Sequence, residues 1–431
     1  MNAVHIIKAL AVGILAGIAN AFNYDQPYRG QYHFSPQENW INDPSGLLYH
    51  DGIYHLFFQY NPGGIEWGNL SWGHATSKDL THWEEQPVAL LARGYGGNVT
   101  EMYFTGSAVV DMKNTSGFGK NGKTPIVAMY TSFYPVTQTL PSGKAIQENQ
   151  QAQSIAYSLD DDWNLASEFG PYNAQGGVWE CPSIFQLPLD GGKSTKWILT
   201  AALNPSGPPG TVGSGNQYFG PDFYAAAGYN GLPIDTHVQI GWMNNWQYGA
   251  NIPPSTWHGA TTIPRHLTLK TIGDKRAAYS HKYNAVQEGS HYVGTTGETM
   301  KINLSFSAAS KASKFAIAVR GSADFTEQTL VGYDFVKKQV FVDRTKSGDV
   351  SFDNTFASVY RGPLAAGVDG MVNLSIFVDR SSVEVFGGQG ETTLTAQIFP
   401  RRDALNAKLL STGGATESVK LDIFNVASTW K

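Results

Sequence analysis

The chain has 431 residues, of which 42% are hydrophobic and only 15% are charged, so it is long enough for two domains and can bury a large core. The net charge is −5 and no run of Lys or Arg occurs, which argues against nucleic acid or an anionic membrane as a partner. The 47 glycines and the 13% aromatic content are typical of an all-β protein with many turns, and exposed aromatic rings suit sugar binding.

Residues 1–21 have the pattern of a secretory signal peptide. Lys8 ends a short basic segment, an apolar run spans Ala9–Ile18, and Ala19-Asn20-Ala21 fits an A-x-A cleavage site. The run is shorter than the ~20 apolar residues that a membrane span requires, and no second run of that length follows. We therefore expect a secreted, extracellular protein that is soluble and monomeric and has no membrane partner.

The sequons and the single cysteine both suit an exported chain that packing alone stabilises. Five N-x-S/T triplets are candidate glycosylation sites: Asn69, Asn98, Asn114, Asn303 and Asn373. Cys181 is the only cysteine, so no intramolecular disulfide can form. We interpret Cys181 as a buried space-filling residue and not as a nucleophile, because its neighbours Glu180 and Pro182 would not stabilise a thiolate.

The first half of the mature chain consists of short β-type segments separated by turn residues. Asp51-Gly52 between residues 46–50 and 53–59 is a hairpin signal. Further strands are expected at residues 125–132, 154–159, 196–201 and 223–227. No long amphipathic helix is predicted after residue 21. Periodicity does not distinguish a propeller from a barrel here.

The second half shows a cleaner alternation. Apolar residues at positions 372, 374, 376 and 378 alternate with polar ones, Asp379–Ser382 forms a turn, and the apolar pattern resumes at Val383. This pattern predicts a half-buried antiparallel hairpin, as in a β-sandwich. A polar stretch without clear periodicity precedes it, so we predict two β-domains and a connection, at residues 22–272, 284–431 and 273–283 respectively.

Two acidic residues stand in unusual surroundings. Asp43 lies in the segment Trp40–Gly46 and Glu180 in Trp179–Pro182, each near a Trp and a Pro. The simplest interpretation is a turn at a strand end, since Asp-Pro-Ser-Gly suits a type I turn. A carboxylic acid among apolar neighbours, however, has a raised pKa and can donate a proton near neutral pH. Two such groups facing one substrate are the minimum for cleaving a glycosidic bond, so both interpretations stay open on the residues alone.

Several dispersed motifs together resemble glycoside hydrolase family 32. Trp40–Gly46 resembles the family signature W-M-N-D-P-N-G, and Val378–Phe386 resembles that of its C-terminal sandwich. Further matches follow in the family's order at Phe57–Pro62, Trp67-Gly68, Phe104–Ser107 and Trp179–Pro182. Segments 168–181 and 241–249 look closest to fungal exo-inulinases. The resemblance implies an all-β fold, namely a five-bladed β-propeller followed by a C-terminal β-sandwich.

The resemblance also assigns roles to the two carboxyls. Asp43 is expected to be the nucleophile that forms a covalent fructosyl-enzyme, and Glu180 to protonate the leaving oxygen and then activate water. Such a retaining mechanism requires the two carboxyls to lie ~5–5.5 Å apart. The expected reaction releases terminal β-fructose from inulin, levan or sucrose.

The remaining site residues follow from the same resemblance. The side chains expected to hydrogen-bond or enclose the fructose are Asn42, Gln59, Ser107, Trp67 and Trp246. For Trp246, core packing is the alternative interpretation. No metal and no cofactor are expected, because His74 and His82 lack ligand spacing and no cofactor motif occurs.

The chain departs from the family pattern between the two carboxylates. The family has an Arg-Asp-Pro motif there, whose Asp stabilises positive charge in the transition state. Here the only Arg-Asp is Arg402-Asp403 and the only Asp-Pro is Asp43-Pro44. Where the motif should fall, residues 156–160 run almost directly into residues 166–169, so about one blade of ~40–50 residues is missing. Two further abrupt joins lie near residues 219–221 and 272–283.

The missing segment predicts a loss of activity. Removing one preorganised electrostatic group costs ~10²–10³ in rate, and a misplacement of ~1 Å between the carboxyls costs a further ~10². The expected protein is therefore an exo-inulinase relative with impaired or no activity. The alternatives are a working exo-hydrolase, a non-catalytic fructan-binding remnant, an incorrect gene structure, and a fructosyltransferase that shares the covalent intermediate.

Overall fold

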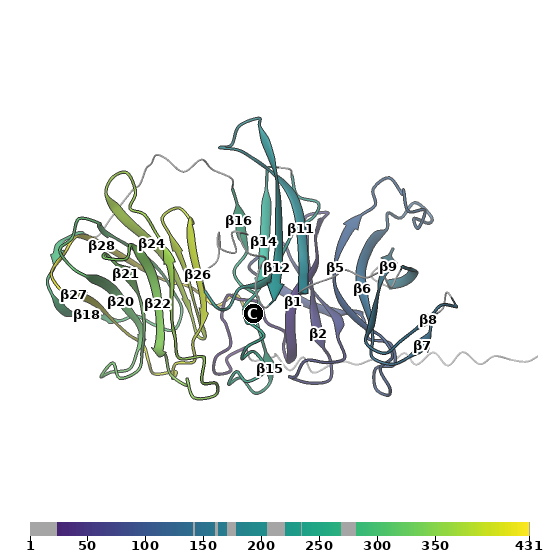
Figure 1. The fold of residues 1–431 in the computed structure, drawn as a ribbon, viewed down its shortest axis with the longest axis horizontal. Coiled ribbons are helices and arrows are strands. Elements are labelled where there is room, and N and C mark those ends of the chain that lie inside the picture. Colours follow the sequence, from purple (N-terminus) through teal and green to yellow (C-terminus); the bar gives the residue numbers. More distant parts are fainter. Residues whose placement is uncertain are drawn as a thin grey trace, which may run out of the picture.

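The computed structural model describes residues 24–140, 143–159, 163–169, 178–204, 220–233, 235–268 and 282–430. Every regular element in these ranges is a β-strand, which confirms the all-β prediction for this part of the chain (Figure 1). The strands form an N-terminal lobe (residues 24–268) and a C-terminal lobe (residues 282–430). The predicted signal peptide lies outside the described residues. So does the predicted linker, except that its last two residues begin strand β17.

The first sheet of the N-terminal lobe is an antiparallel meander with one added strand. Its order is β15-β1-β2-β3-β4, with β15 parallel to β1. The strands span Asn39–His50 (β1), Ile53–Asn61 (β2), Ser71–Ser77 (β3), Trp83–Leu90 (β4) and Trp257–His258 (β15). The hairpin β1–β2 turns at Asp51-Gly52, where both residues have positive φ, as the Asp-Gly signal predicts.

Three further sheets and one short hairpin complete the N-terminal lobe. The second sheet has the order β10-β9-β6-β5, the third is β11-β12, and the fourth is β13-β14-β16. Their strands are Met102–Val110 (β5), Ile126–Tyr134 (β6), Gln150–Ser158 (β9), Trp163–Phe169 (β10), Val178–Pro188 (β11), Thr195–Asn204 (β12), Tyr224–Gly228 (β13), His237–Trp242 (β14) and Arg265–Leu267 (β16). Gln138–Thr139 (β7) and Ala145–Ile146 (β8) form the hairpin. The four strands predicted between residues 125 and 227 all overlap these elements.

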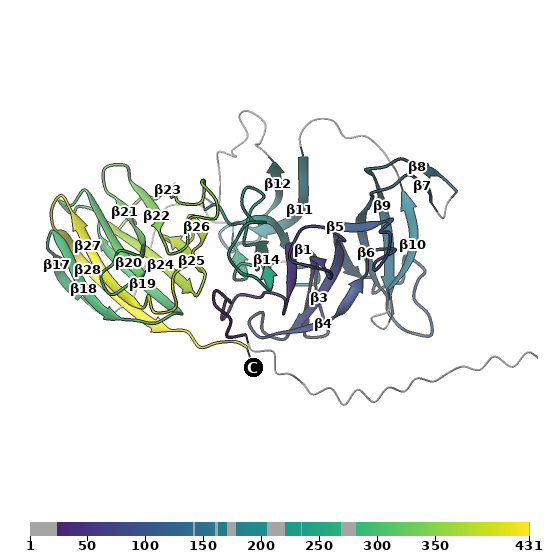
Figure 2. The same cartoon turned by 90° about the horizontal axis from the view of Figure 1, so that it is seen from below.

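Strand β1 lies at the centre of the N-terminal lobe. It contacts β5 on one side and β13 and β14 on the other, and Figure 2 shows it between the sheets that contain β14 and β5. Its apolar residues enter two separate clusters: Ile41 packs with Phe58 and Ile240, and Trp40 packs with Trp242. Because both faces of β1 are buried, its sequence shows no polar alternation, which explains why part of this strand also fits a turn interpretation.

The C-terminal lobe consists of two six-stranded sheets packed face to face. Their orders are β17-β28-β19-β24-β25-β26 and β18-β27-β20-β21-β22-β23. Alternate residues such as Ile302 and Leu374 from the first sheet and Ile317 and Val331 from the second share one core. The strands are Lys282–Val286 (β17), Gly289–Thr295 (β18), Met300–Ser307 (β19), Lys314–Gly321 (β20), Gln328–Asp334 (β21), Gln339–Lys346 (β22), Val359–Pro363 (β23), Met371–Asp379 (β24), Ser382–Gly387 (β25), Thr392–Gln397 (β26), Asn406–Thr412 (β27) and Thr416–Asn425 (β28). The predicted hairpin is β24–β25.

Buried ion pairs join the two lobes. His33 binds Asp379 at 2.8 Å and Glu384 at 3.0 Å, and Arg265 also binds Glu384. Burial by itself lowers the pKa of His33, but the hydrogen bonds to Asp379 and Glu384 outweigh it and raise the pKa to about 9. Burial raises the pKa of Glu384, but the Arg265 charge and His33 lower it to about 2. The two acidic residues belong to the motif Val378–Phe386, so this motif attaches the C-terminal lobe to the N-terminal lobe.

Candidate active site

The first strand of each of the four larger sheets described in the N-terminal lobe carries a β-bulge. The register shifts lie between Ile41 and Pro44 in β1, between Tyr103 and Gly106 in β5, between Glu180 and Ser183 in β11, and between Tyr224 and Ala227 in β13. A bulge redirects a side chain and is common beside active sites. The turn that the Asp-Pro-Ser-Gly sequence suggested at residues 43–46 is therefore wrong, because these residues form the bulged part of β1.

Side chains from the four bulges meet in one place. Cys181 Sγ lies 3.7 Å from Asp43 Oδ2 and 3.7 Å from Thr105 Oγ1, while the Tyr224 hydroxyl donates to Glu180 Oε2 at 2.7 Å. Cys181 has a φ of 48°, a conformation that costs energy for a residue with a side chain. Residues that are far apart in the sequence thus form one polar cluster, with Asp43 and Glu180 both in it.

Asp43 lies in a buried position that alters its protonation. Burial raises its pKa to about 7; the Asn42 amide opposes this shift and the charge of Glu180 adds to it. Its Oδ1 has no hydrogen-bond partner among the described residues. Trp40 Nε1 donates to Asn42 Oδ1 at 2.7 Å and so fixes the orientation of this amide beside Asp43. The direction of the shift for Asp43 agrees with the expectation from its apolar sequence neighbours.

Glu180 and Cys181 project from the bulge of β11. Glu180 is half-buried; after burial, its hydrogen bond to Tyr224 and its charge are the next causes that raise the pKa of Tyr224. Burial also raises the pKa of the Cys181 thiol, so this group stays neutral and donates only weakly to Asp43. The prediction that Cys181 only fills space is therefore incomplete.

Gln59 joins Asn42 and Asp43 through the strand register. In the β1–β2 pair, Ile41 lies opposite Tyr60 and Pro44 opposite Phe58, so Asn42 and Asp43 together face Gln59. Gln59 is buried, and its Nε2 has no hydrogen-bond partner in the part of the chain that the structure describes. A buried amide donor without a partner suits a position that binds a polar ligand.

Ser107, on β5, lies beside a part of β1 that follows Asp43. Its hydroxyl accepts a hydrogen bond from Asn230 Nδ2 at 3.0 Å, and the neighbouring Gly106 N–H donates to Ser45 Oγ at 3.0 Å. Asn230 in turn bridges to Leu48. The structure therefore connects Ser107 to the middle of β1, whereas Asn42 and Gln59 lie directly beside Asp43.

The two tryptophans that are predicted to enclose the sugar, Trp67 and Trp246, differ in their packing. Trp67 is 44% exposed and makes an edge-to-face contact with Phe104 at 6.2 Å between ring centroids. Trp246 is 40% exposed, and it stacks on Trp40 at 6.2 Å and contacts Trp242 at 4.9 Å. Trp246 thus packs on core rings with one side and keeps an exposed surface, so the two interpretations of this residue are compatible.

A buried ion pair between Arg344 of the C-terminal lobe and Asp222 of the N-terminal lobe supports the segment that carries Trp246. Arg344 Nη1 binds Asp222 Oδ2 at 2.9 Å, and both side chains are fully buried. Asp222 also accepts hydrogen bonds from Asn245 at 2.9 Å and from the Tyr248 hydroxyl at 2.6 Å. Sequence reasoning missed these residues and Tyr224, because their contacts cross between sheets and lobes and leave no local pattern.

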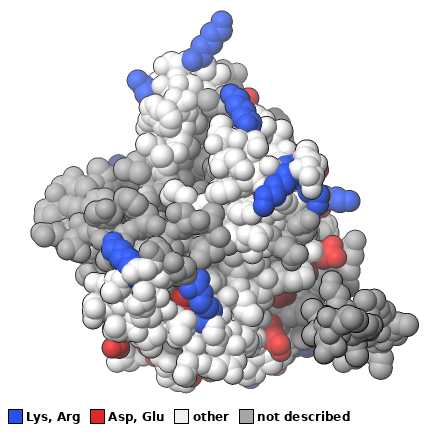
Figure 3. Space-filling model, turned by 90° about the vertical axis from the view of Figure 1, so that its right-hand side faces the viewer, with Lys and Arg blue, Asp and Glu red and all other residues white. Residues whose placement is uncertain are grey.

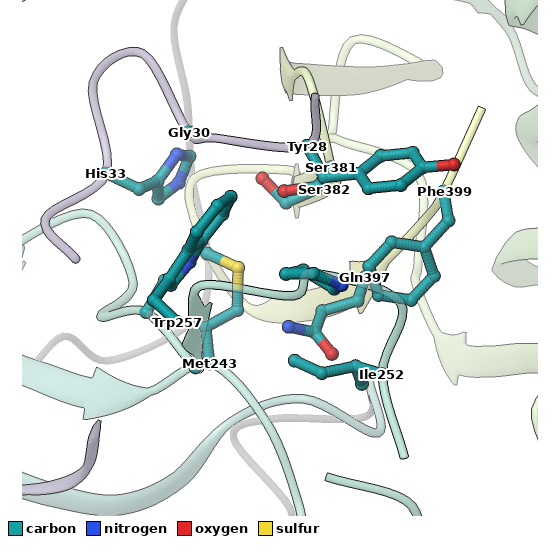
Figure 4. A pocket seen from close by; sticks show the side chains of 13 residues that line it. Tyr28, Gly30, His33, Met243, Ile252, Trp257, Ser381, Ser382, Gln397 and Phe399 are labelled. Atoms are coloured by element: carbon teal, nitrogen blue, oxygen red, sulfur yellow. The ribbon is translucent and has the colours of Figure 1, made fainter. Parts of the chain in front are cut away.

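The small enclosed cavity in Figure 4 lies at the lobe junction and not at the polar cluster. Tyr28, His33, Met243 and Trp257 are among its lining residues, and its water-accessible volume of about 10 Å³ suffices for about one water molecule. None of its lining residues is among the predicted site residues. The cavity therefore belongs to the packing between the lobes.

The visible surface charges and the acidic, His and Cys side chains of the described ranges form neither a charged patch on the face in Figure 3 nor a metal-ligand cluster. On the face in Figure 3, basic and acidic side chains are scattered among uncharged ones. No group of three or more His, Cys, Asp or Glu residues among those described is placed to hold a metal ion. The described part of the chain also contains no helix long and apolar enough to cross a membrane.

The five sequons differ in accessibility. Asn98 and Asn114 are exposed, whereas Asn69 is half-buried and donates to Asn61 Oδ1 at 3.3 Å. Asn303 and Asn373 are half-buried on the neighbouring strands β19 and β24.

Comparison with known proteins identifies the family. The model for the glycosyl hydrolases family 32 N-terminal domain matches residues 33–162 and 215–280, and the model for the family 32 C-terminal region matches residues 268–425. The extracellular exo-inulinase of Aspergillus ficuum is 61% identical over 533 aligned residues, which cover 99% of this chain and 99% of that protein. The levanase of Bacillus subtilis (strain 168) is 34% identical, and the alignment covers 98% of this chain and 74% of the levanase. The chain belongs to glycoside hydrolase family 32.

Solved structures agree with this membership. The exo-inulinase from Aspergillus awamori is 58% identical with a TM-score of 0.87, and the match covers 95% of this chain and 100% of that chain. The β-fructofuranosidase from Schwanniomyces occidentalis complexed with fructose is 23% identical with a TM-score of 0.69, and the match covers 92% of this chain and 97% of that chain. The second similarity concerns the fold alone.

Proposed function

We propose that this chain is a secreted exo-inulinase-type hydrolase by descent, and that its own activity is strongly impaired. The single observation that carries the proposed chemistry is the meeting of Asp43 and Glu180 in one cluster built from the bulged first strands of four sheets. The extracellular exo-inulinase of Aspergillus ficuum, 61% identical, supports fructan as the substrate class and secretion as the destination.

In the proposed reaction, Asp43 attacks the anomeric carbon of a terminal β-fructose unit and Glu180 protonates the departing oxygen. Glu180 then removes a proton from water, which hydrolyses the fructosyl–Asp43 ester with retention of configuration. Asn42, Gln59 and Ser107 hydrogen-bond the fructose hydroxyls, and Trp67 and Trp246 enclose the sugar. The unpaired Asp43 Oδ1 and Gln59 Nε2 support this arrangement.

We further propose that the N-terminal lobe derives from a five-bladed propeller with one blade missing or incomplete. Between residues 39 and 267 the structure describes sheets of five, four, two and three strands besides the short hairpin, whereas propeller blades have four strands each. The alignment with the Aspergillus ficuum protein extends over 533 positions although this chain has 431 residues, so at least 102 positions have no counterpart here. The match to the N-terminal family model stops at residue 162, next to the place where the motif is expected, and resumes at residue 215, so the family pattern is interrupted there.

The same proposal includes the predicted organisation of the chain. Residues 1–21 form the signal peptide, residues 22–272 the catalytic domain, residues 273–283 the linker and residues 284–431 the sandwich. The exported chain is a monomer that is glycosylated at its accessible sequons, foremost Asn98 and Asn114. The extents of the two family matches support the division near residue 280.

The protonation state of Asp43 gives the proposed reaction a pH dependence. A nucleophilic carboxylate must be ionised, but burial holds the pKa of Asp43 at about 7. Below pH 7 most molecules therefore carry a protonated Asp43, and the reactive fraction increases as the pH rises through this value.

Fructose release from inulin and from sucrose tests the proposal directly. We expect the purified chain to be at least ~10²-fold slower than the intact Aspergillus awamori exo-inulinase, and any residual activity to disappear in Asp43→Asn and in Glu180→Gln. Release at the rate of the intact enzyme would contradict the impairment. Residual activity that both variants retain would contradict the assignment of the two carboxylates.

A non-catalytic fructan-binding remnant is the second candidate function. The partly exposed ring of Trp246 and the unpaired donor of Gln59 favour it, because both can bind a sugar without chemistry. Titration with an inulin-derived oligosaccharide distinguishes the two, since a remnant binds the sugar and releases no fructose.

A further inference from the structure

A cavity far from the polar cluster contains a buried arginine whose charge has no carboxylate bonded to it. The cavity lies where the N-terminal segment meets the C-terminal lobe, and it has a water-accessible volume of about 50 Å³. Arg320, Arg380, Arg401, Arg402, Glu298, Tyr28, Pro27 and Pro400 line it. None of these residues takes part in the proposed reaction.

Arg320 is the unusual member of this lining. It is 1% exposed, and its Nε and Nη1 have no hydrogen-bond partner among the described residues. Its Nη2 donates only to the carbonyl oxygen of Arg401, at 3.2 Å. Burial lowers its pKa from the usual value, but a guanidinium stays charged in proteins. A buried charged group without a bonded counterion is costly, so a binding partner is expected.

The other arginines of the cavity are already neutralised. Arg380 binds Glu298 at 2.8 Å and Asp25 at 2.7 Å, and Arg402 binds the same two carboxylates. Arg401 binds Glu327 at 3.1 Å. The positive charge left over is that of Arg320.

Arg380 adds a further donor to the same cavity. Its Nη1 is buried and has no hydrogen-bond partner in the described ranges, although its Nε and Nη2 are both engaged. Arg320 and Arg380, which both line this cavity, therefore have three nitrogens between them whose N–H groups have no partner among the described residues. Arg320 thus offers two free nitrogens as a fork and Arg380 one more donor, and guanidinium N–H groups recognise the oxygens of carboxylates and phosphates.

We propose that this cavity binds a small tetrahedral oxyanion, such as inorganic phosphate or sulfate, between Arg320 and Arg380. The volume decides the class of ligand: one water needs ~10–15 Å³, so the cavity has room for about four oxygens and is too small for a sugar ring. The bound anion ties the segment around Tyr28 to strand β20 and to the turn between β24 and β25.

Thermal unfolding of the full exported chain tests the site without any need for activity. We expect about 20 mM inorganic phosphate to raise the Tm by about 2–3 °C relative to chloride at equal ionic strength, with a similar effect of sulfate. Arg320→Met should fold, because it removes a buried charge and keeps an unbranched apolar side chain, and it should lose this shift. Arg361→Met, in the same lobe but outside the cavity, should keep it.

If Arg320→Met does not fold, calorimetric titration with phosphate provides a second measurement. In that experiment Arg320→Lys keeps the charge but loses the fork, and we expect it to bind phosphate about tenfold more weakly than the unchanged chain. The proposal is overturned if phosphate and chloride give the same Tm. It is also overturned if Arg320→Met shows the same phosphate shift as the unchanged chain.

Discussion

The two lobes respond differently to the loss of chain that we propose. The C-terminal lobe has two six-stranded sheets in which strands far apart in the sequence pair, such as β17 with β28 and β18 with β27, and one core cluster holds both sheets together. The N-terminal lobe has sheets of five, four, two and three strands, and its apolar residues divide into several clusters. A lobe built from repeated sheets can lose one repeat and keep the others, because each sheet forms most of its contacts within itself.

The site does not share this tolerance. Asp43, Thr105, Cys181 and Tyr224 come from four different sheets, so each sheet contributes at least one side chain to the cluster. A missing sheet removes a side chain from such a site and also alters the spacing of the rest. The comparison therefore teaches that folding and catalysis depend on different parts of the same lobe.

The largest expected effect is a gain of activity. Inserting a segment with the family's Arg-Asp-Pro motif and its flanking strands between residues 160 and 166 should raise fructose release by ~10²–10³-fold or more, since it restores a preorganised electrostatic group. The matched control is the same insertion with the Asp of that motif changed to Asn, which should restore strands but little rate. Equal rates for both insertions would mean that geometry alone limits this chain.

The next effect concerns the attachment of the lobes. Arg344→Met leaves the Asp222 carboxylate buried and unpaired and should lower the free energy of unfolding by ~3–5 kcal/mol, as measured by urea denaturation. The double variant Arg344→Met with Asp222→Asn should recover part of this loss, because it removes the unpaired charge. If Arg344→Met alone is as stable as the original chain, the charges of the Arg344–Asp222 pair contribute nothing to stability.

The sequence predicts local structure better than contacts between sheets. The alternation at residues 372–378 and the Asp51-Gly52 turn each predict a hairpin that the structure contains, because period and turn chemistry are local. The bulge at Asp43 was open to a turn interpretation, since a strand buried on both faces shows no alternation. The motif resemblance supplied Asp43 and Glu180, but nothing local indicates Tyr224 or Arg344, whose partners lie in other sheets.

A smaller effect is a pH window for the contact between the lobes. The pKa of His33 rises from 6.5 to about 9 on folding, so its contribution is complete below pH 6.5 and is lost as the pH rises through 9. The pKa of Glu384 falls from 4.5 to about 2, so its contribution is complete above pH 4.5 and is lost as the pH falls through 2. Both contributions are complete between pH 4.5 and 6.5.

Melting curves across pH test this window. We expect His33→Gln to lower the Tm most between pH 4.5 and 6.5, progressively less as the pH rises from 6.5 to 9, and little above pH 9. His82→Gln is the matched control: His82 pairs with Asp79 at 2.8 Å but is 52% exposed, and surface pairs contribute little. A His33→Gln deficit that is constant from pH 5 to pH 10 would show that packing, and not charge, accounts for the role of His33.

The smallest expected effect distinguishes a sugar-binding wall from a packing residue. Trp246→Ala should weaken binding of an inulin-derived oligosaccharide by about tenfold, because an exposed aromatic face contributes ~1 kcal/mol or more to such a contact. Calorimetric titration measures this even if the chain releases no fructose. The control is Trp197→Ala, which removes a more exposed ring, 66% accessible, on β12 and should leave the affinity unchanged. If Trp246→Ala lowers the Tm but binds the oligosaccharide as well as the original chain does, the stacking on Trp40 and Trp242 is the whole function of this ring.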